Sequence, residues 1–413
     1  MMRLVNYYAW FTLAIVLLIV TNVIGRYFFD LRFDFAVDVS WQLYAILIML
    51  GASYSLANDS HIRTDIYFKN FSKRTQNIID FAGYLMFFPA FGILTYVSML
   101  DTYKSVLMNE KSSATMSQLI IYPMKIGVTL GVLLLLFQGF VKMRHCWRAF
   151  TLIFLALGFG YVVMGQNVFD LAYYNLIGGL SNEVFMAIPM FIFMGYICER
   201  AGLVERLFDS LKTVVGNLYI VVIIIAVLIS LATGVVGASV TLLGIMAAPH
   251  MMRLGYNPKL TAGVIAGGGS MIMIPPSVPL IVMAPTMNLN IIDLYAGVLV
   301  PGLMIASMYM IYCSFYPRPK SDEKPQYGRV LIDVLPLTFL IAMVLGSMLF
   351  GLATSTEAAS FGAFGAIILA LLNGRLSLRE SLLKTCDTTS VVMLLALASM
   401  IFGAVFTSLG GDT

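Results

Sequence analysis

Apolar segments long enough to cross a membrane recur from one end of this chain to the other, and they limit its possible folds more than any other feature. A helix needs roughly 20 apolar residues to cross about 30 Å of hydrocarbon. Such segments lie near residues 6–26, 40–58, 77–99, 124–143, 150–169, 184–198, 217–248, 259–285, 292–316, 331–350, 356–373 and 388–410. With 60% hydrophobic and 11% charged residues among 413, the apolar surface exceeds what one water-soluble core can bury. The sequence therefore predicts an all-α polytopic membrane protein.

Basic and acidic connections alternate between these segments, and this alternation predicts the orientation of the chain. Cytoplasmic loops of membrane proteins retain Lys and Arg. Basic connections lie at 61–74, 142–148, 200–212, 253–259, 318–329 and 375–384, and acidic ones at 30–38, 101–110, 170–183 and near 293. The opening segment lacks a small-residue cleavage site, so we interpret it as the first span rather than a signal peptide. We expect a multi-pass inner-membrane protein with a cytoplasmic amino terminus and a periplasmic carboxy terminus.

Several kinds of chemistry are excluded by the residues that the sequence lacks. It has no Gly-rich phosphate loop, so we do not expect ATP hydrolysis, and any pumping must use an ion gradient. The cysteines are single and the histidines stand among loop cations, so no transition-metal site is predicted. The spans contain almost no clustered nucleophiles or acids, which argues against an enzyme. No basic, aromatic-rich surface indicates a nucleic-acid partner, and no cofactor is expected.

The apolar run at 217–248 is the first place where a single regular helix does not fit. Basic connections flank it on both sides, so the chain must enter the membrane and return, which predicts a re-entrant helical hairpin with its turn near 234–239. Irregular backbone at that depth is tolerated only where protein or a water-filled cavity satisfies it. Hydroxyl oxygens there would suit a hard cation, and helix N-termini an anion. The candidate binding residues are Thr233, Gly234, Gly237, Ser239 and Thr241. The alternative is a Gly/Ser-rich packing seam without a ligand.

The next apolar segment contains a second break. Gly-Gly-Gly-Ser at 267–270 and Pro-Pro-Ser at 275–277 cannot continue one regular helix, because proline removes a backbone donor and clashes with the preceding turn. A broken helix beside a hairpin tip is the arrangement by which many secondary transporters hold a coupling ion and a substrate. The candidate residues here are Gly268, Gly269, Ser270, Pro275, Pro276 and Ser277. The alternative is a proline kink without a ligand.

These motifs resemble the tripartite ATP-independent periplasmic (TRAP) transporters over nearly the whole chain. Residues 1–148 resemble the four-helix DctQ-type small subunit, notably through the helix end at 51–60 followed by His-Ile-Arg-Thr-Asp at 61–65. Residues 149–413 resemble the DctM-type large subunit. The large-subunit motifs are Ala-Ile-Pro-Met-Phe at 187–191, Thr-Gly-Val-Val-Gly-Ala-Ser at 233–239, Arg-Leu-Gly-Tyr at 253–256, Ile-Pro-Pro-Ser at 274–277, Val-Pro-Gly at 300–302 and Thr-Ser-Thr-Glu-Ala-Ala at 354–359.

The resemblance implies a sodium-coupled, elevator-type carrier that imports small organic acids delivered by a separate periplasmic binding protein. The hairpin and the broken helix would form one sodium site and part of the substrate cavity, while the four-helix part would brace the moving domain. Our hypothesis is that sodium orders these breaks, an organic anion then binds, and the inner bundle crosses the bilayer. Glu357 belongs to a family motif and is a further candidate, with helix capping as the alternative.

Two departures from the family pattern bear on this expectation. Large subunits of this family normally continue through a second hairpin and a second broken helix, which this sequence does not contain, and Met271 stands where a glycine is usual. We therefore also consider a truncated, non-transporting membrane scaffold, or a fragment that needs another chain to complete its site. Sodium-dependent binding of a solute would distinguish a transporter from a scaffold.

Overall fold

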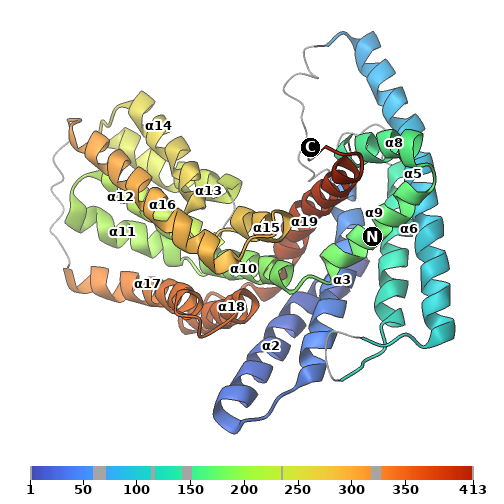
Figure 1. The fold of residues 1–413 in the computed structure, drawn as a ribbon. Coiled ribbons are helices and arrows are strands. Elements are labelled where there is room, and N and C mark those ends of the chain that lie inside the picture. Colours follow the sequence, from blue (N-terminus) through green and yellow to red (C-terminus); the bar gives the residue numbers. More distant parts are fainter. Residues whose placement is uncertain are drawn as a thin grey trace. The chain divides into compact units, whose positions relative to one another are not determined.

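The structure, a computed structural model, describes residues 2–58, 71–112, 117–141, 151–233, 236–317 and 327–411. Over these ranges the chain is helical almost throughout, and the only extended pairing among them is an isolated bridge between Lys111 and Ile120 (Figure 1). By length and composition, eight helices of this part can cross a membrane, and Asn167–Leu180 (α9) with Glu183–Arg200 (α10) pass the same test together. The predicted all-α polytopic architecture is confirmed.

Internal contacts divide the chain into two compact units, Met1–Met186 with Leu382–Thr413, and Ala187–Ser381. The first unit holds α1 (Met2–Tyr8), α2 (Trp10–Phe29), α3 (Asp34–Ala57), α5 (Lys73–Met108), α6 (Tyr122–Val141), α8 (Thr151–Met164), α9 and most of α19 (Leu378–Ser408). The second holds most of α10, α11 (Leu203–Val215), α12 (Leu218–Thr233), α13 (Val236–Arg253), α14 (Pro258–Gly268), the 3-10 helix η1 (Gly269–Met273), α15 (Val278–Thr286), α16 (Ile291–Ser314), α17 (Tyr327–Leu349) and α18 (Ser355–Leu372).

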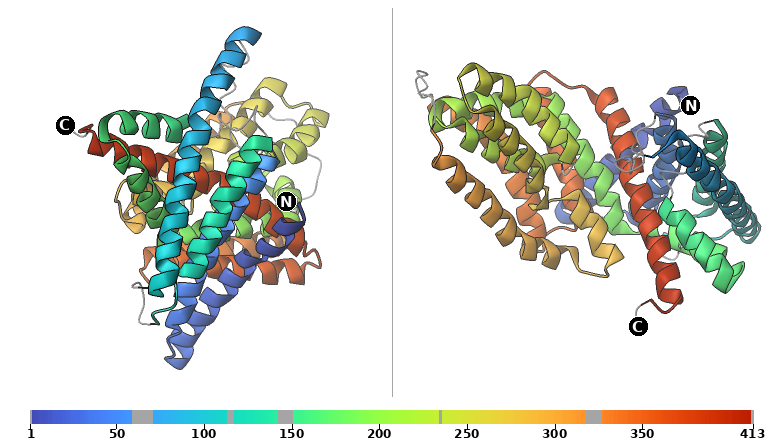
Figure 2. Two further views of the ribbon diagram at one scale, coloured as in Figure 1. Left: turned by 90° about the vertical axis from the view of Figure 1, so that its right-hand side faces the viewer. Right: turned by 90° about the horizontal axis from the view of Figure 1, so that it is seen from above.

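Glycines set the spacing of the helices in the first unit. A Cβ atom at Gly131 of α6 would lie 2.6 Å from the Cβ of Met49 on α3, and one at Gly127 would lie 2.6 Å from Ile46 Cγ1. Helices without side chains at the contact can approach closely, which is how membrane helices gain packing energy without a hydrophobic driving force. The α2–α3 pair and the α5–α6 pair therefore form a compact four-helix part, which can be followed in Figures 1 and 2.

A cluster of charged side chains joins this four-helix part to α9. Lys125 on α6 is 8% exposed, and its Nζ lies 2.7 Å from Asp101 Oδ2 on α5 and 2.6 Å from Glu110 Oε2. The hydroxyl of Tyr173 on α9 donates a hydrogen bond of 2.9 Å to the same carboxylate of Asp101. Partly buried charges are stable only when paired in this way. The cluster therefore links the DctQ-like helices to the beginning of the DctM-like sequence.

Helix α9 was not expected from the sequence, because we placed one span at 150–169 and an acidic connection at 170–183. In the structure α8 ends at Met164, where Gly165 adopts a left-handed backbone (φ +63), and α9 begins at Asn167. Asp170 lies in the first turn of α9, where an acidic side chain is favourable to the helix dipole. The expectation of a loop was wrong because it took an acidic helix N-terminus for a connection.

Helix α19 packs antiparallel to α3 within the first unit. Near the end of α3, the hydroxyl of Ser55 donates to the carbonyl of Asp387, 3.1 Å away. Nearer the start of α3, the hydroxyl of Tyr44 donates to Met393 Sδ over 3.3 Å. Between these two contacts Gly51 lies directly against Ser390 of α19. The missing side chain at Gly51 is therefore what allows the two helices to touch.

The domain boundary predicted at 148/149 falls among residues outside the described part and stays a prediction.

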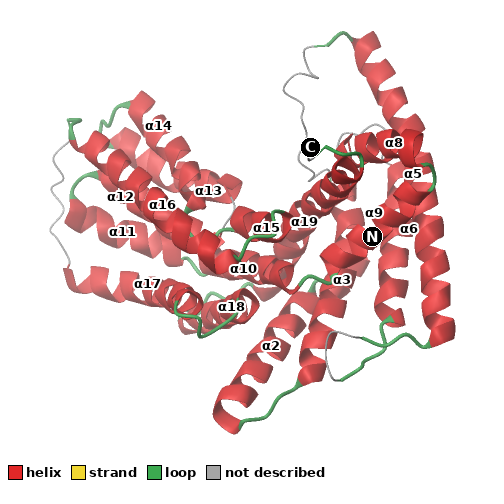
Figure 3. Ribbon diagram, viewed as in Figure 1, coloured by secondary structure: helices red, strands yellow, loops and turns green. Residues whose placement is uncertain are grey.

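Figure 3 shows only helices and connecting loops in the second unit as well. Its helices α12, α13, α14 and α16 pack on one another, and α11 lies against α12 and α17. Polar contacts fasten the end of α10 and the start of α11. Arg200, the last residue of α10, pairs with Glu380. On α11, Arg206 donates to Asn373 at the end of α18, and Glu205 lies 3.8 Å from Arg375. The unit thus holds the hairpin and the broken helix in a common helical frame.

Candidate functional site

Helices α12 and α13 form a hairpin, because the start of α12 and the end of α13 lie side by side. The backbone N–H of Leu218, at the start of α12, donates to the hydroxyl of Tyr256 over 3.2 Å, and the N–H of Asn257, just after α13, donates to the hydroxyl of Tyr219 over 3.1 Å. The two tyrosine rings stack edge to face at 4.8 Å. The segment is therefore a hairpin whose two ends are fastened together, as the basic residues on both sides of the run predicted.

The tip of the hairpin is shorter than the sequence predicted. Helix α12 continues to Thr233 and α13 begins at Val236, so only Gly234 and Val235 separate them, and both lie outside the described residues. Gly237, Ser239 and Thr241 are helical rather than part of an irregular turn, because the helix period resumes at Val236. The expectation of a turn extending to Ser239 was wrong. The side chain of Thr233 and the surroundings of Gly237 also fall outside the described part.

Ser239 and Thr241 do not face the same environment. Ser239 is buried, at 1% exposure, whereas Thr241 is exposed. Residues two positions apart on a helix point to different faces. The structure therefore separates these two candidate ligands, and only Ser239 lies in the interior of the second unit.

The predicted break in the next helix is present. Asn257 caps the start of α14 by accepting from the N–H of Lys259 over 2.9 Å, and the helix ends at Gly268. Five residues of 3-10 helix follow. Ile274 and Ser277 then have extended backbones (ψ 124 and 128), and α15 begins at Val278. Pro275 and Pro276 have no backbone N–H, so the segment from Ile274 to Ser277 cannot form the hydrogen bonds of a helix.

The hairpin and the broken helix meet at Gly268. A Cβ atom on Gly268 would lie 3.0 Å from the Cβ of Ala226 on α12 and 3.1 Å from Leu243 Cδ1 on α13. Gly269 is buried beside it, and Met271, which stands at the departure from the family pattern, is 1% exposed in η1. Both hairpin helices therefore approach the backbone closely at the break, and a larger residue at this position would have to displace them by a few tenths of an ångström.

Buried hydroxyls without partners lie in this region. Ser277 is fully buried, with no exposed surface, and its hydroxyl has no hydrogen-bond partner among the described residues. The hydroxyl of Ser230 on α12 is also buried and unpaired in the part of the chain described, and Tyr295 on α16 is buried as well. Tyr295 faces the backbone N–H of Ser277. Since an unsatisfied buried hydroxyl costs about 1–3 kcal/mol, these oxygens are available to a ligand.

The remaining candidates at the broken helix, Ser270, Pro275 and Pro276, have local structural roles. Ser270 is exposed, and its hydroxyl donates to the carbonyl of Gly267 over 2.6 Å, so it closes a local turn. Pro275 and Pro276 are buried and shape the extended segment. Two of the buried hydroxyl-bearing residues were not predicted from the sequence. Ser230 stands three residues before the Thr-Gly-Val-Val-Gly-Ala-Ser motif, and Tyr295 lies in an apolar span without any local pattern that marks it.

Glu357 forms a capping box at the start of α18. Its Oε2 accepts from the backbone N–H of Thr354 over 3.0 Å, and its own N–H donates to the Thr354 hydroxyl over 3.3 Å. This reciprocal arrangement satisfies two amide groups at the helix start and suits a carboxylate near the positive end of the helix dipole. The capping role that the sequence left as an alternative is therefore present, and a role for Glu357 in binding stays a prediction.

A hairpin fastened at its base, packed on a helix that breaks at Gly268, defines a polytopic membrane protein of the secondary-transporter type. Two family models match the chain: the DctQ component of tripartite ATP-independent periplasmic transporters over residues 15–149, and the DctM component over residues 117–413. The chain belongs to the TRAP transporter family and combines both membrane components in one polypeptide. It is a transport protein and not an enzyme.

Three relatives show how far the similarity extends. The sialic acid TRAP transporter large permease protein SiaM of Vibrio cholerae is 30% identical over 67% of this chain and 67% of its own length. The isethionate TRAP transporter permease protein DctMQ of Oleidesulfovibrio alaskensis is 25% identical over 96% of this chain and 73% of its own length. The C4-dicarboxylate TRAP transporter large permease protein DctM of Pseudomonas aeruginosa is 28% identical over 54% of this chain. The chain spans 56% of the length of that last relative.

Proposed function

We propose that this chain is the membrane component of a sodium-coupled TRAP transporter of the inner membrane, which imports small organic acids delivered by a periplasmic binding protein. The relatives are named for sialic acid, isethionate and C4-dicarboxylates, which supports an organic acid as the substrate class. The alternation of basic and acidic connections supports a cytoplasmic amino terminus and a periplasmic carboxy terminus.

The observation that carries this proposal is the set of unpaired buried oxygens beside the two breaks. Ser277 follows the extended Pro-Pro segment, and Ser230 lies on α12, the hairpin helix that contacts η1 just before that segment. A desolvated sodium ion needs oxygen ligands, which hydroxyls and the carbonyls of unwound backbone supply. The first turn of α15 contributes the backbone N–H groups of Val278 and Leu280, since Pro279 between them has none. A helix N-terminus of this kind favours the carboxylate of a substrate. Sodium binding would thus order the same segment that contacts the anion.

The test is uptake of labelled organic acids by proteoliposomes that contain the full chain. Uptake should require both a sodium gradient and the binding protein. In the variants Ser277→Ala, Ser230→Ala and the double variant Ser239→Ala with Ser277→Ala, the sodium concentration for half-maximal uptake should rise by about tenfold, because a hydrogen-bonding contact to a charge contributes about 1.5 kcal/mol.

The matched control is Ser307→Ala. Ser307 is exposed on α16, and its hydroxyl bonds only to the carbonyl of Leu303 in its own helix, 2.7 Å away. Its sodium dependence should equal that of the wild type. Folded protein that neither binds nor transports a solute in the presence of sodium would contradict the proposal and favour the scaffold alternative. Unchanged sodium dependence in the double variant would overturn the assignment of the site.

A further inference from the structure

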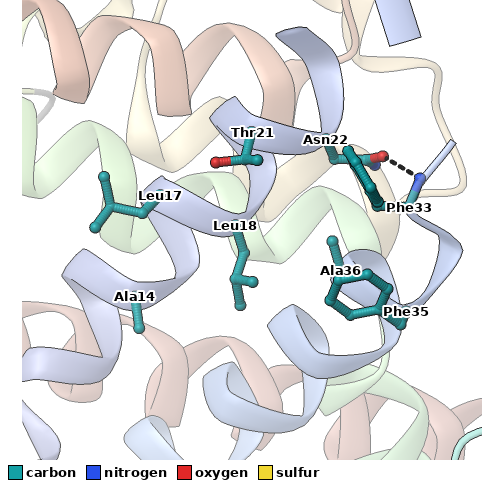
Figure 4. A pocket seen from close by; sticks show the side chains of 8 residues that line it. All are labelled: Ala14, Leu17, Leu18, Thr21, Asn22, Phe33, Phe35 and Ala36. Atoms are coloured by element: carbon teal, nitrogen blue, oxygen red, sulfur yellow. Dashed lines mark hydrogen bonds between the residues drawn. The ribbon is translucent and has the colours of Figure 1, made fainter. Parts of the chain in front are cut away.

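A groove of about 400 Å³ lies between α2 and α3 in the first unit. Figure 4 shows Leu17 and Leu18 of α2 on one wall, with Phe35 of α3 opposite them. Leu17 is 46% exposed, so the groove opens on the outer surface of the helix pair. In water such an apolar groove would be unfavourable, but in a bilayer it faces hydrocarbon.

Contacts within the chain fix the loop after α2 at the outer end of the groove. The backbone N–H of Phe33 donates to Asn22 Oδ1 over 3.0 Å, drawn as a dashed line in Figure 4. The ring of Phe33 also lies against Gly25, where a Cβ atom would be 2.6 Å from Phe33 Cε2. These contacts hold the loop after α2 in place beside the groove. The shape of the groove at this end is therefore fixed by contacts within the chain.

The length of the groove matches one leaflet of a bilayer. Ala14 and Asn22 mark its two ends on α2, and at 1.5 Å per residue they lie about 12 Å apart along the helix. Half of the hydrocarbon core is about 15 Å thick. An occupant that fills this groove is thus long, apolar and about as deep as one leaflet, which describes an acyl chain.

The residues beyond the outer end have the character of a membrane interface. Tyr27, Phe28 and Phe29 are 59%, 80% and 68% exposed at the end of α2, and aromatic side chains gather where hydrocarbon meets headgroups. Exposed Arg32 and Asp30 lie in the same loop and offer one charge of each sign. A headgroup that carries both a phosphate and an amine would find a partner for each.

From these features we infer that the α2–α3 groove binds one phospholipid from the outer leaflet, with an acyl chain along Leu17 and Leu18 and a zwitterionic, amine-bearing headgroup at Arg32 and Asp30. The lipid would complete the surface of the DctQ-like helices, where the protein itself leaves a channel. This site is separate from the two helix breaks and does not depend on the transport activity.

The experiment uses the full chain purified in detergent and a phosphatidylethanolamine with a photoreactive group in its acyl chain. After illumination, cross-linked peptides should map to residues 14–22 and 33–36. The variant Ala14→Phe, which fills the groove, should reduce the cross-linking there at least fivefold, whereas Ala404→Phe, at a half-buried position of α19, should not. Cross-linking that spreads over all apolar helices and is unaffected by Ala14→Phe would overturn the inference.

The headgroup is tested separately with Arg32→Gln, a substitution at an exposed position that should not alter the fold. This variant should bind phosphatidylethanolamine about fivefold more weakly, because one basic residue at a membrane surface contributes about 1 kcal/mol. Binding of a diacylglycerol with the same chains should not change. If native mass spectrometry instead showed a dimer in place of a lipid adduct, and Ala14→Phe dissociated it, the occupant would be a second copy and the lipid proposal would be wrong.

Discussion

Replacing Lys125 by methionine tests how the DctQ-like helices are held to the sequence that follows them. The Lys125 ammonium lies within 2.7 Å of Asp101 and 2.6 Å of Glu110, so its removal leaves two carboxylates without their cation. Breaking a buried ion pair costs about 3–5 kcal/mol, whereas exposed pairs contribute about 0–1 kcal/mol. The side chains of Asp101 and Glu110 are 25% and 41% exposed, so water solvates part of the remaining charge.

We therefore expect Lys125→Met to lower the free energy of unfolding by about 2–3 kcal/mol, which is less than the full cost of a buried pair. For a unit of this size that corresponds to a thermal midpoint lower by about 5–10 °C, measured by intrinsic fluorescence in detergent. The control is Lys104→Met, since Lys104 is an exposed lysine of α5. Its midpoint should stay within about 1 °C of the wild type.

A triple variant separates charge from packing. Adding Asp101→Asn and Glu110→Gln to Lys125→Met removes the uncompensated charges and should recover most of the lost stability, because neutral groups of the same shape carry a smaller desolvation penalty. If Lys125→Met and Lys104→Met lowered the midpoint equally, the cluster would contribute no specific stability. If the triple variant were no more stable than Lys125→Met, charge would not be the cause of the loss.

Two further predictions concern packing and capping. Gly51→Ala should lower the free energy of unfolding by about 1–3 kcal/mol, because a Cβ atom there collides with Ser390 of α19. The matched Gly178→Ala, at a helical glycine with open space around it, should be neutral or slightly stabilising, and equal effects of the two would contradict the packing argument. Thr354→Ala removes the side chain that accepts from the N–H of Glu357 and should cost about 1 kcal/mol, whereas Thr354→Ser should retain most of that stability.

Charge and length were sufficient to predict the hairpin, because these properties constrain the path of the backbone. An apolar run with basic residues at both ends has to return to its starting side, and the contacts of Tyr219 and Tyr256 show that it does. Likewise, glycines and prolines at 267–277 exclude a continuous helix whatever packs around them. The sequence predicts such features well because each follows from a local rule.

Which side chains meet at the breaks was harder to predict. The length of the hairpin tip decides the rotation of α13, and a tip of two residues in place of six turns Ser239 inward and Thr241 outward. Tyr295 stands in an apolar helix, and only tertiary packing brings it to the backbone of Ser277. No local pattern distinguishes such a tyrosine from any other in a membrane span.

The seam between α3 and α19 has a consequence for a chain in which two membrane components are joined. Contacts at Tyr44, Gly51 and Ser55 connect the amino-terminal helices to a helix more than three hundred positions later. A covalent tether makes such an encounter intramolecular, with an effective concentration on the order of millimolar for a short flexible linker. Partners that are separate polypeptides must associate tightly enough to survive dilution in the membrane. Joined in one chain, such a seam can be weak in itself and still remain occupied.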